Sequence, residues 1–338
     1  MLLTGGGKSL LFTVPACLDE PRVTIVVVLY QALINDLVGR IRVSGIECIK
    51  WKHEENNPAA VVVVSADMAG EPGFLKYAGL LSGKRLLRRV VVNECHLIFT
   101  SSNWRPKLAK LRNLRVLPCL IVLLTATLPP VLEEDLGESI LVRCATYIRA
   151  CTARPNIRYV VSWCERRRLQ EMTVYMYRRQ RRLLRGGKKG VVYCNSKAQC
   201  EAIAAELECA YYHADLVDRT NRLEVWVAEG GLIVATSALG TGVDFPGIMF
   251  VLHVGMPWSM IDYAQESRRG GRAGETTDSI ILMEDGQVEA RLAKSSGSIN
   301  VHAMGLFIQG AGYRRGIISE YLDRKRVECG DIDATGCD

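Results

Sequence analysis

The stretch Thr4-Gly5-Gly6-Gly7-Lys8-Ser9 decides how the fold of this chain is interpreted. Consecutive glycines let backbone N–H groups turn around phosphate oxygens, a lysine neutralises the β- and γ-phosphates, and a serine ligates Mg²⁺. The stretch therefore predicts a phosphate-binding loop, formed by Thr4, Gly5, Gly6, Gly7, Lys8 and Ser9. The first glycine of the full pattern is replaced by Leu2, and only a few residues stand where a strand normally precedes such a loop. We expect a nucleotide-driven protein that lacks its first strand; a flexible Gly-rich linker is the alternative.

Composition bounds the class of protein. The chain has 338 residues, of which 49% are apolar and 23% charged, as in a globular protein of about two domains. No uninterrupted apolar run approaches the ~18 residues of a membrane span, and no secretory signal is recognisable. The twelve cysteines include no C-x-x-C pair, which argues against a disulfide scaffold or an ordinary zinc knuckle. A reducing, intracellular compartment is expected.

The net charge of +7 is concentrated between residues 166 and 189, where arginines and lysines cluster. A partner that carries phosphates would explain this excess. A solvated basic helix face explains the stretch equally simply.

Short, β-branched apolar runs recur along the chain and are separated by helical stretches. Continuous apolar runs of this kind are typical of buried strands in a parallel sheet. The runs are 23–29, 60–64, 90–92, 120–124, 159–161, 190–193, 232–235, 250–253 and 279–282. They predict an α/β fold repeated twice, with a boundary near residues 143–156. Beyond about residue 289 the pattern fades, and one helix is expected at 312–324.

Polar residues suited to phosphate chemistry follow several of these runs. Asn93-Glu94-Cys95-His96 follows one run, and Thr125 and Thr127 follow the next. A Gly-rich loop follows residue 235, and Arg269 and Arg272 follow Gln265. A spacing of three would place these arginines on one helix face, from which they could reach a γ-phosphate. Cys95 is expected to be a small buried residue and His253 a core histidine.

These segments, in this order, resemble the RecQ family of ATP-dependent DNA helicases. Arg154-Pro155-Asn156 resembles the start of the second domain of that family, and 190–194 resembles its motif IV. Ala235-Thr236 with Gly242 and Asp244 resembles motif V, and Gln265 with Arg269 and Arg272 resembles motif VI. The resemblance implies an α/β fold of two tandem RecA-like (P-loop) parallel-sheet domains, at 1–150 and 151–288. A partial zinc-binding-like helical tail would follow at 289–338.

The resemblance also implies an activity, its ligands and a set of site residues. We expect a 3′–5′ DNA helicase that uses ATP and Mg²⁺, binds single-stranded or partial-duplex DNA and works in the nucleus in recombination and repair. ATP would lie between the two domains. The implied catalytic residues are Lys8, Glu94, Gln265, Arg269 and Arg272. Gly242 and Asp244 join the phosphate loop in binding nucleotide, and Ser9 and Asn93 lie at the Mg²⁺ position. The implied nucleic-acid contacts are Trp104, Arg105, Thr125, Ser196, His213 and Thr236.

Departures from the family pattern open a second interpretation. Asn93 replaces an acidic residue, and an amide supplies no negative charge to Mg²⁺. Arg268 and Gly270 replace Gly and Ala in motif VI, and Tyr313 stands where the tail has a cysteine. Cys329 and Cys337 alone make a poor tetrahedral zinc site, so Zn²⁺ is not expected in this chain. The alternative is a degenerate relative that binds nucleic acid without efficient ATP turnover; an RNA-directed relative is a third possibility.

Overall fold

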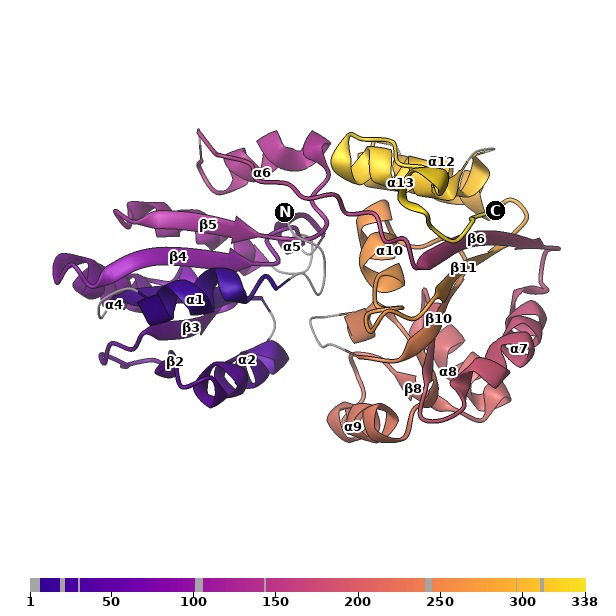
Figure 1. The fold of residues 1–338 in the computed structure, drawn as a ribbon, viewed down its shortest axis with the longest axis horizontal. Helices are drawn as coiled ribbons and strands as arrows, with labels where there is room; N and C mark the ends of the chain where they lie inside the picture. The colour runs from indigo at the N-terminus through magenta and orange to yellow at the C-terminus, as the bar shows by residue number, and fades with distance from the viewer. Residues whose placement is uncertain are drawn as a thin grey trace. The chain divides into compact units, whose positions relative to one another are not determined.

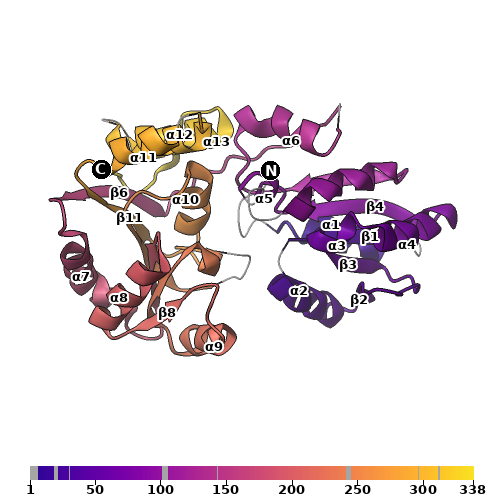
Figure 2. The same ribbon diagram turned by 180° about the vertical axis from the view of Figure 1, so that it is seen from behind.

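The computed structural model describes residues 7–18, 22–29, 31–100, 106–142, 144–240, 245–295, 297–310 and 313–338. The chain divides into two compact units, Met1–Thr152 and Ala153–Asp338, and each is described by itself. Figures 1 and 2 show both units from opposite sides. Both are built on a parallel sheet with helices packed against it, as the spacing of the apolar runs predicts.

The first unit is built on a five-stranded sheet in the order β2-β3-β1-β4-β5. Its strands are β1 (Val23–Val28), β2 (Cys48–Lys50), β3 (Val61–Ser65), β4 (Leu87–Asn93) and β5 (Leu120–Leu124). All pairs are parallel, and Val26 of β1 lies opposite Val63 of β3 and Val91 of β4. Every residue of β1 and β3 is buried, which explains their unbroken apolar sequences. Four of the five strands coincide with predicted apolar runs; β2 was not predicted.

Helices connect these strands. They are α1 (Leu10–Leu18), α2 (Gln31–Val43), α3 (Ala66–Ala69), α4 (Pro72–Gly83), α5 (Leu97–Thr100) and α6 (Glu133–Ser139), with 3₁₀ turns η1 (Pro106–Val116) and η2 (Pro130–Leu132). Gly70, which follows α3, is required by close packing. A Cβ on Gly70 would lie 2.2 Å from the carbonyl oxygen of Lys110 in η1.

The second unit is built on a six-stranded parallel sheet in the order β6-β11-β10-β7-β9-β8. Its strands are β6 (Ile157–Cys164), β7 (Lys189–Cys194), β8 (Ala210–Tyr212), β9 (Gly231–Ala235), β10 (Ile248–Val254) and β11 (Thr277–Glu284). In β7, Val192 and Cys194 join one apolar cluster, whereas Val191 and Tyr193 join another. Because successive strand residues point to opposite faces, both faces of this sheet are covered.

Helices α7 (Leu169–Gln180) and α8 (Lys197–Leu207) pack on one face, around Cys200 and Ile203. The other face holds α9 (Arg219–Glu229), with Trp226 against Phe245, and α10 (Met260–Ser267), whose Tyr263 packs against Tyr159 and Phe307. Short turns η3 (Arg181–Leu184) and η4 (Ser237–Gly240) follow α7 and β9.

The C-terminal region is more helical than the sequence predicts. Besides α13 (Arg314–Asp323), which was predicted, it forms α11 (Gln287–Lys294), α12 (Ile299–Gln309) and the turn η5 (Gly330–Ile332). Figure 1 shows α12 and α13 lying together beside β6 and α10. Phe307 and Leu322 are fully buried in the cluster with Tyr159 of β6. The prediction of a single helix was wrong because a Gly- and Ser-rich stretch at 295–298 interrupts the periodic pattern between α11 and α12.

Candidate functional site

The phosphate-loop lysine forms an ion pair inside the first unit. Gly7 adopts φ +72°, a left-handed conformation that suits glycine, and its carbonyl accepts the N–H of Leu10 at the start of α1. Lys8 Nζ forms an ion pair with Glu94 Oε1, at the end of β4. The fold thus brings together two predicted catalytic residues that are 86 positions apart. The predicted residues Thr4, Gly5 and Gly6 lie outside the described residues.

Glu94 reaches Lys8 because the backbone reverses directly after β4. Its φ is +55°, which is uncommon for a residue with a side chain and often marks a functional turn. The next amide, Cys95 N–H, donates to Leu124 O at 3.0 Å and so fixes the turn against β5. Cys95 itself is buried; burial and the adjacent Glu94 raise its thiol pKa to about 12, although Lys8 opposes this. A thiol of this pKa is not a nucleophile at neutral pH, as predicted.

His96 connects the glutamate to the next strand end. Its Nδ1 lies 2.9 Å from Thr125 Oγ1 and 3.4 Å from Glu94 Oε2, and the ring is buried. Thr125 Oγ1 in turn accepts the N–H of Thr127 at 3.1 Å. The predicted site omitted His96, although its position two residues after Glu94 was a usable signal. Thr125, predicted to contact nucleic acid, is buried, and its hydroxyl is occupied by His96 and the Thr127 N–H.

The oxygen donors beside Lys8 fit a magnesium ion held mainly by phosphates and water. Asn93 ends β4 opposite Leu124 and is half-buried, as is Ser9. Across the part of the chain that the structure describes, no cluster of three or more His, Cys, Asp or Glu residues could hold a metal. Mg²⁺ characteristically uses one or two protein oxygens together with substrate phosphates and waters. Ser9 and Glu94 fit that pattern, and Asn93 contributes an uncharged oxygen.

Three predicted nucleic-acid residues follow adjacent strands of the second sheet. Ser196 follows β7, His213 follows β8 and Thr236 follows β9, so all three lie at the carboxyl edge. Ser196 is exposed and caps α8 by accepting the N–H of Gln199. Thr236 is half-buried. His213 is only 5% exposed, and its Nε2 lies 2.8 Å from Glu201 Oε1. His213 therefore holds the strand end and offers little surface to a ligand.

A buried histidine–glutamate pair lies at the same edge, and the predicted site did not include it as a pair. His253 Nε2 of β10 lies 3.0 Å from Glu266 Oε2 of α10. The ring of Tyr193 stacks on His253 with centroids 5.2 Å apart. These three residues line a small surface pocket together with Trp258. His253 is a core histidine, as predicted, but its pairing with Glu266 links motif VI to β10.

The arginines of motif VI lie in a turn, and the prediction that they share a helix face was wrong. Helix α10 ends at Ser267, and residues 268–274 form turns, because three glycines occur within five residues. Arg269 is 4% exposed, with its guanidinium carbon 5.9 Å from the centre of the Phe245 ring. Arg272 Nε donates to Arg268 O at 3.4 Å. Gln265 is half-buried on α10; Gly242 and Asp244 lie outside the described residues.

Electrostatics places the same arginines near the end of β7. Burial raises the pKa of the Tyr193 phenol, and both Arg269 and Arg272 act against that shift. Their positive charge therefore acts on the Tyr193 phenol, which lies near the end of β7 beside His253.

Arg154-Pro155-Asn156 holds this arginine turn in place. Arg154 Nη2 donates to Gly271 O at 2.7 Å, and Asn156 Nδ2 donates to the carbonyls of Gly271 and Glu275, both at 2.7 Å. Gly271 has φ +64°, and a Cβ there would lie 2.4 Å from Asn156 Nδ2. The segment at the start of the second unit thus fixes the loop that carries Arg269 and Arg272.

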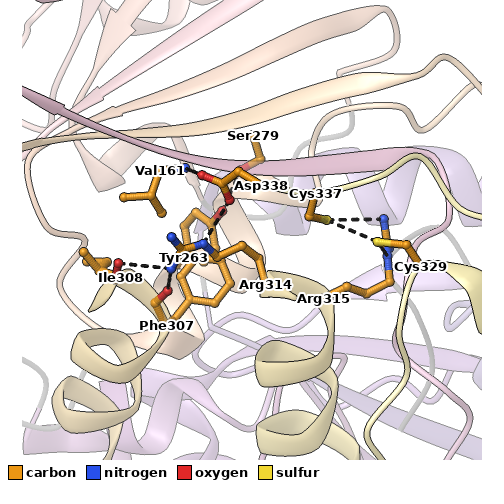
Figure 3. Close-up of polar contacts among 10 residues, drawn as sticks. All are labelled: Val161, Tyr263, Ser279, Phe307, Ile308, Arg314, Arg315, Cys329, Cys337 and Asp338. Carbon is orange, nitrogen blue, oxygen red and sulfur yellow. Dashed lines mark hydrogen bonds and ion pairs between the residues drawn. The ribbon is translucent and has the colours of Figure 1, made fainter. Parts of the chain in front are cut away.

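The predicted site residues Trp104 and Arg105 lie outside the described residues. In the C-terminal tail, Cys329 and Cys337 lie together, with their sulfurs 3.6 Å apart. Within the described ranges no further His, Cys, Asp or Glu completes a metal-binding cluster around them. Two thiolates, whose sulfurs Figure 3 shows beside Arg315, supply two of the four ligands of a tetrahedral zinc site.

Two family descriptions match the chain. "DEAD/DEAH box helicase" matches residues 2–134, and "Helicase conserved C-terminal domain" matches residues 171–274. Among curated proteins, the chain is 30% identical over 314 residues to "RecQ-like DNA helicase blm-1" of Caenorhabditis elegans, covering 83% of this chain and 31% of that protein. It is 29% identical to "ATP-dependent DNA helicase Q5" of Mus musculus, covering 99% of this chain and 39% of that protein. The chain thus spans about a third of the length of these relatives.

Solved structures confirm the fold. "S. cerevisiae Dbp5 bound to RNA and ADP BeF3" superposes with a TM-score of 0.66 at 15% identity, covering 98% of this chain and 86% of that chain. "Crystal Structure of DUF1998 helicase MrfA bound to DNA" gives a TM-score of 0.67 at 15% identity, covering 91% and 49%. The prediction of two tandem RecA-like domains with a helical C-terminal end is confirmed. Among the described residues, no helix combines the length and apolarity needed to cross a bilayer.

The two helicase domains, their order along the chain and the curated relatives together identify the chain as a member of the RecQ family of DNA helicases.

Proposed function

We propose that the chain acts as an ATP-dependent 3′–5′ DNA helicase or translocase that couples ATP hydrolysis to unwinding in DNA recombination and repair. The observation that carries the proposal is the ion pair between Lys8 and Glu94, connected through His96 to Thr125. A cation on a glycine-rich loop and a carboxylate at the end of a neighbouring strand are two of the parts that P-loop ATPases use to hold the phosphates and to position the attacking water. The names of the curated relatives support DNA as the substrate.

In this proposal, binding of the nucleotide breaks the ion pair between Lys8 and Glu94. The phosphates of ATP carry more negative charge than one carboxylate, so the ammonium moves to them and the Glu94 carboxylate is released. The freed carboxylate then accepts a proton from the attacking water. Residues 4–9, Gly242 and Asp244 bind the nucleotide. Mg²⁺, bound near Ser9 and Asn93, would neutralise charge on the phosphates.

Arg269 and Arg272 stabilise the charge that develops on the transferred phosphoryl group, and Gln265 orients the reactants. Bidentate guanidinium groups suit this role, because their fork matches the geometry of phosphate oxygens. The contacts from Arg154 and Asn156 to Gly271 support the proposal, since they hold the arginine loop in one conformation.

DNA binding is assigned to a set of polar and aromatic residues from both units. Ser196 and Thr236, with Trp104 and Arg105, contact the nucleic acid, whereas Thr125 and His213 position the surrounding backbone. The net charge of +7 supports binding that depends mainly on phosphates. By this proposal the protein works in the nucleus; its domains are 1–150, 151–288 and a tail at 289–338, and it needs no zinc.

Lys8→Ala tests the proposal, with the exposed Lys84 as a matched control. DNA-stimulated phosphate release should be abolished by Lys8→Ala, because the γ-phosphate loses its cation, and should be unchanged by Lys84→Ala. Equal rates for Lys8→Ala and the parent protein would refute the assignment of the phosphate loop.

A second candidate function rests on Asn93 alone. Because this amide stands where the family has an acidic residue, the chain would bind nucleic acid and nucleotide but hydrolyse ATP poorly. The two candidates differ in one measurement, the turnover of the parent protein with saturating DNA and Mg²⁺.

A further inference from the structure

A tryptophan is exposed on the loop between β10 and α10. Trp258 is 48% exposed, although its neighbours Pro257 and Ser259 are buried. Single exposed apolar residues are common on protein surfaces, so exposure alone assigns no function to this side chain. What distinguishes Trp258 is its surroundings: a rigid loop, a stacked cation and a polar pocket.

The loop that carries Trp258 is anchored at three points. The N–H of Gly255 donates to a carbonyl of β11 at 2.8 Å, and Asn195 Nδ2 donates to Met256 O at 3.0 Å. Ser259 caps α10 by accepting a backbone N–H of that helix at 3.1 Å. An aromatic side chain on a loop that is already fixed loses little conformational freedom when it binds a ligand.

One face of the indole is covered by an arginine of α11, the helix labelled in Figure 2. The guanidinium carbon of Arg291 lies over the Trp258 ring, 4.0 Å from its centre. This is a cation–π contact, which holds the ring from one side. Burial lowers the pKa of Arg291, and among the described residues no carboxylate forms an ion pair with it. Its positive charge is therefore not balanced within the second unit.

The small surface pocket beside the indole carries unused hydrogen-bonding groups. Polar side chains that line this pocket with Trp258 are those of Tyr193, Asn195, Ser237, His253 and Glu266. Within the described ranges, the Tyr193 hydroxyl and His253 Nδ1 are buried and have no hydrogen-bond partner. An aromatic wall beside polar groups suits a flat ring with a polar edge, such as a nucleobase, better than an aliphatic group.

This pocket lies among residues already assigned to nucleic-acid binding. Asn195 directly precedes Ser196, and Ser237 directly follows Thr236. A single strand that contacts Ser196 and Thr236 would therefore bring its bases close to Trp258.

Building on the proposed function, we propose that Trp258 and Arg291 form a base-stacking platform for single-stranded nucleic acid on the second unit. One base stacks on the open surface of the indole, and its polar edge faces the pocket. Arg291 supports the ring from the other side, and its unbalanced charge attracts the phosphates of the strand. Every base has an aromatic face, so the platform binds without sequence preference.

Stacking and phosphate contacts respond differently to salt. Phosphate contacts release counterions, so their contribution falls steeply as salt rises, whereas stacking on Trp258 releases none. Loss of the indole should therefore weaken binding by the same factor at low and high salt. Loss of Arg291 should also reduce the salt dependence, because a positive charge is removed.

The test measures binding of a fluorescein-labelled oligothymidylate to the full chain by fluorescence anisotropy. Trp258→Ala should raise the Kd about tenfold, within the range known for loss of one base–aromatic stack. Trp258→Phe should restore most of the affinity, and Arg291→Met should raise the Kd by roughly threefold. The matched control is Trp163→Ala, at a tryptophan of β6 that is 44% exposed, and it should leave the Kd unchanged.

An abasic oligonucleotide of the same length separates stacking from other effects. It retains the phosphates but offers no ring, so the parent protein and Trp258→Ala should bind it equally. If Trp258→Ala weakens binding of the abasic strand as much as that of oligothymidylate, the residue acts through the fold and the platform is refuted. Urea denaturation of Trp258→Ala should give the midpoint of the parent, since the side chain is exposed.

The outcomes separate this inference from the proposed function. If the parent binds oligothymidylate and Trp258→Ala binds it equally well, the platform is refuted and the helicase proposal stands. A Trp258→Ala variant that loses affinity for a fluorescent ATP analogue and keeps that for oligothymidylate would also refute it, because the ring would then serve the nucleotide. A parent protein that binds no oligonucleotide would refute both.

Discussion

The two sheets are built from similar valine-rich strands, but they end differently. One edge strand of the first sheet is β5, and all its residues are apolar. Residues 120–123 are nevertheless exposed or half-exposed, and Leu120 is 63% exposed. Sheet two ends at β6, in which buried residues such as Tyr159 alternate with more exposed ones. The C-terminal tail also donates to and accepts from the backbone of β6 at Tyr159 and Val161.

The difference teaches that strand composition alone does not make a stable sheet edge. An uncovered apolar edge offers unpaired backbone groups and apolar side chains, whereas β6 has its apolar face under α12 and α13 and its backbone partly satisfied by the tail. The charged sites differ in the same way: Lys8 and Glu94 are partly exposed, whereas Arg269 is almost fully buried. We therefore expect the first unit to adapt to ligands and the second to supply a rigid frame.

The largest effect is expected from the rigid arginine turn. Arg269→Ala and Arg272→Ala should each lower ATP hydrolysis by about 10³-fold or more, because charge on the transferred phosphoryl group loses its partner. Binding of a fluorescent nucleotide should persist, and Arg178→Ala, an exposed arginine on α7, should have little effect. Losses below tenfold for both variants would show that the turn has no part in the chemistry.

The next largest effect is expected on the free energy of unfolding when the buried Arg315 is replaced. Arg315→Met should lower the free energy of unfolding by about 2–4 kcal/mol, since the carbonyls of Arg154, Ile157 and Thr335 lose their donor. Urea denaturation would measure this. Arg182→Met, at an exposed position of η3, should change the same quantity by no more than about 0.5 kcal/mol. Similar values for the two variants would mean that the cluster around Arg315 is not structural.

A smaller effect is expected for amide hydrogen exchange in the two edge strands, β5 and β6. Amides of β6 should exchange with deuterium at least about tenfold more slowly than those of β5, since β6 is covered and β5 lies at an apolar edge. Residues 1–152, expressed alone, should also be less soluble than residues 153–338. Hydrogen exchange of the intact chain measures the first expectation. Equal protection of β5 and β6 would remove the contrast between the sheets.

The smallest effect concerns the uncharged position at the end of β4. Asn93→Asp should raise DNA-stimulated ATP hydrolysis several-fold, with a lower Mg²⁺ requirement, because the carboxylate restores negative charge beside the cation. Asn93→Ser provides a control that keeps an oxygen but adds no charge. If both variants behave like the parent, the amide does not limit turnover and the second candidate function loses its basis.

Much of the fold could be predicted because buried parallel strands leave a local signature. Nine apolar runs became strands, since a short continuous run of buried residues can be recognised locally in the sequence. β2 and β8 were missed because they are three-residue strands at sheet edges, with little apolar sequence of their own. Helices α11 and α12 were missed because glycine and serines between them hide the periodicity.

The site could be predicted less completely, since its contacts join distant residues. Motif spacing selected Lys8, Glu94 and Arg269, but not the pairing of His96 with Thr125 or of His253 with Glu266. The helix-face prediction for Arg269 and Arg272 was wrong because spacing of three was interpreted without the glycines that end α10. The Arg315 cluster has no sequence signature, because carbonyl acceptors belong to every residue type.

The order of strands in the second sheet has a consequence for the time course of synthesis. Strand β6 is made before all the others of its sheet, yet its only strand partner within the described residues is β11, more than a hundred residues later. A ribosome adding about 5–20 residues per second needs several seconds or more to cover that interval. During this interval the apolar residues of β6 lack their partner strand β11 on the nascent chain, where chaperones can bind them. Maturation of this unit is thus paced by translation, and slow codons between β10 and β11 would prolong that exposure.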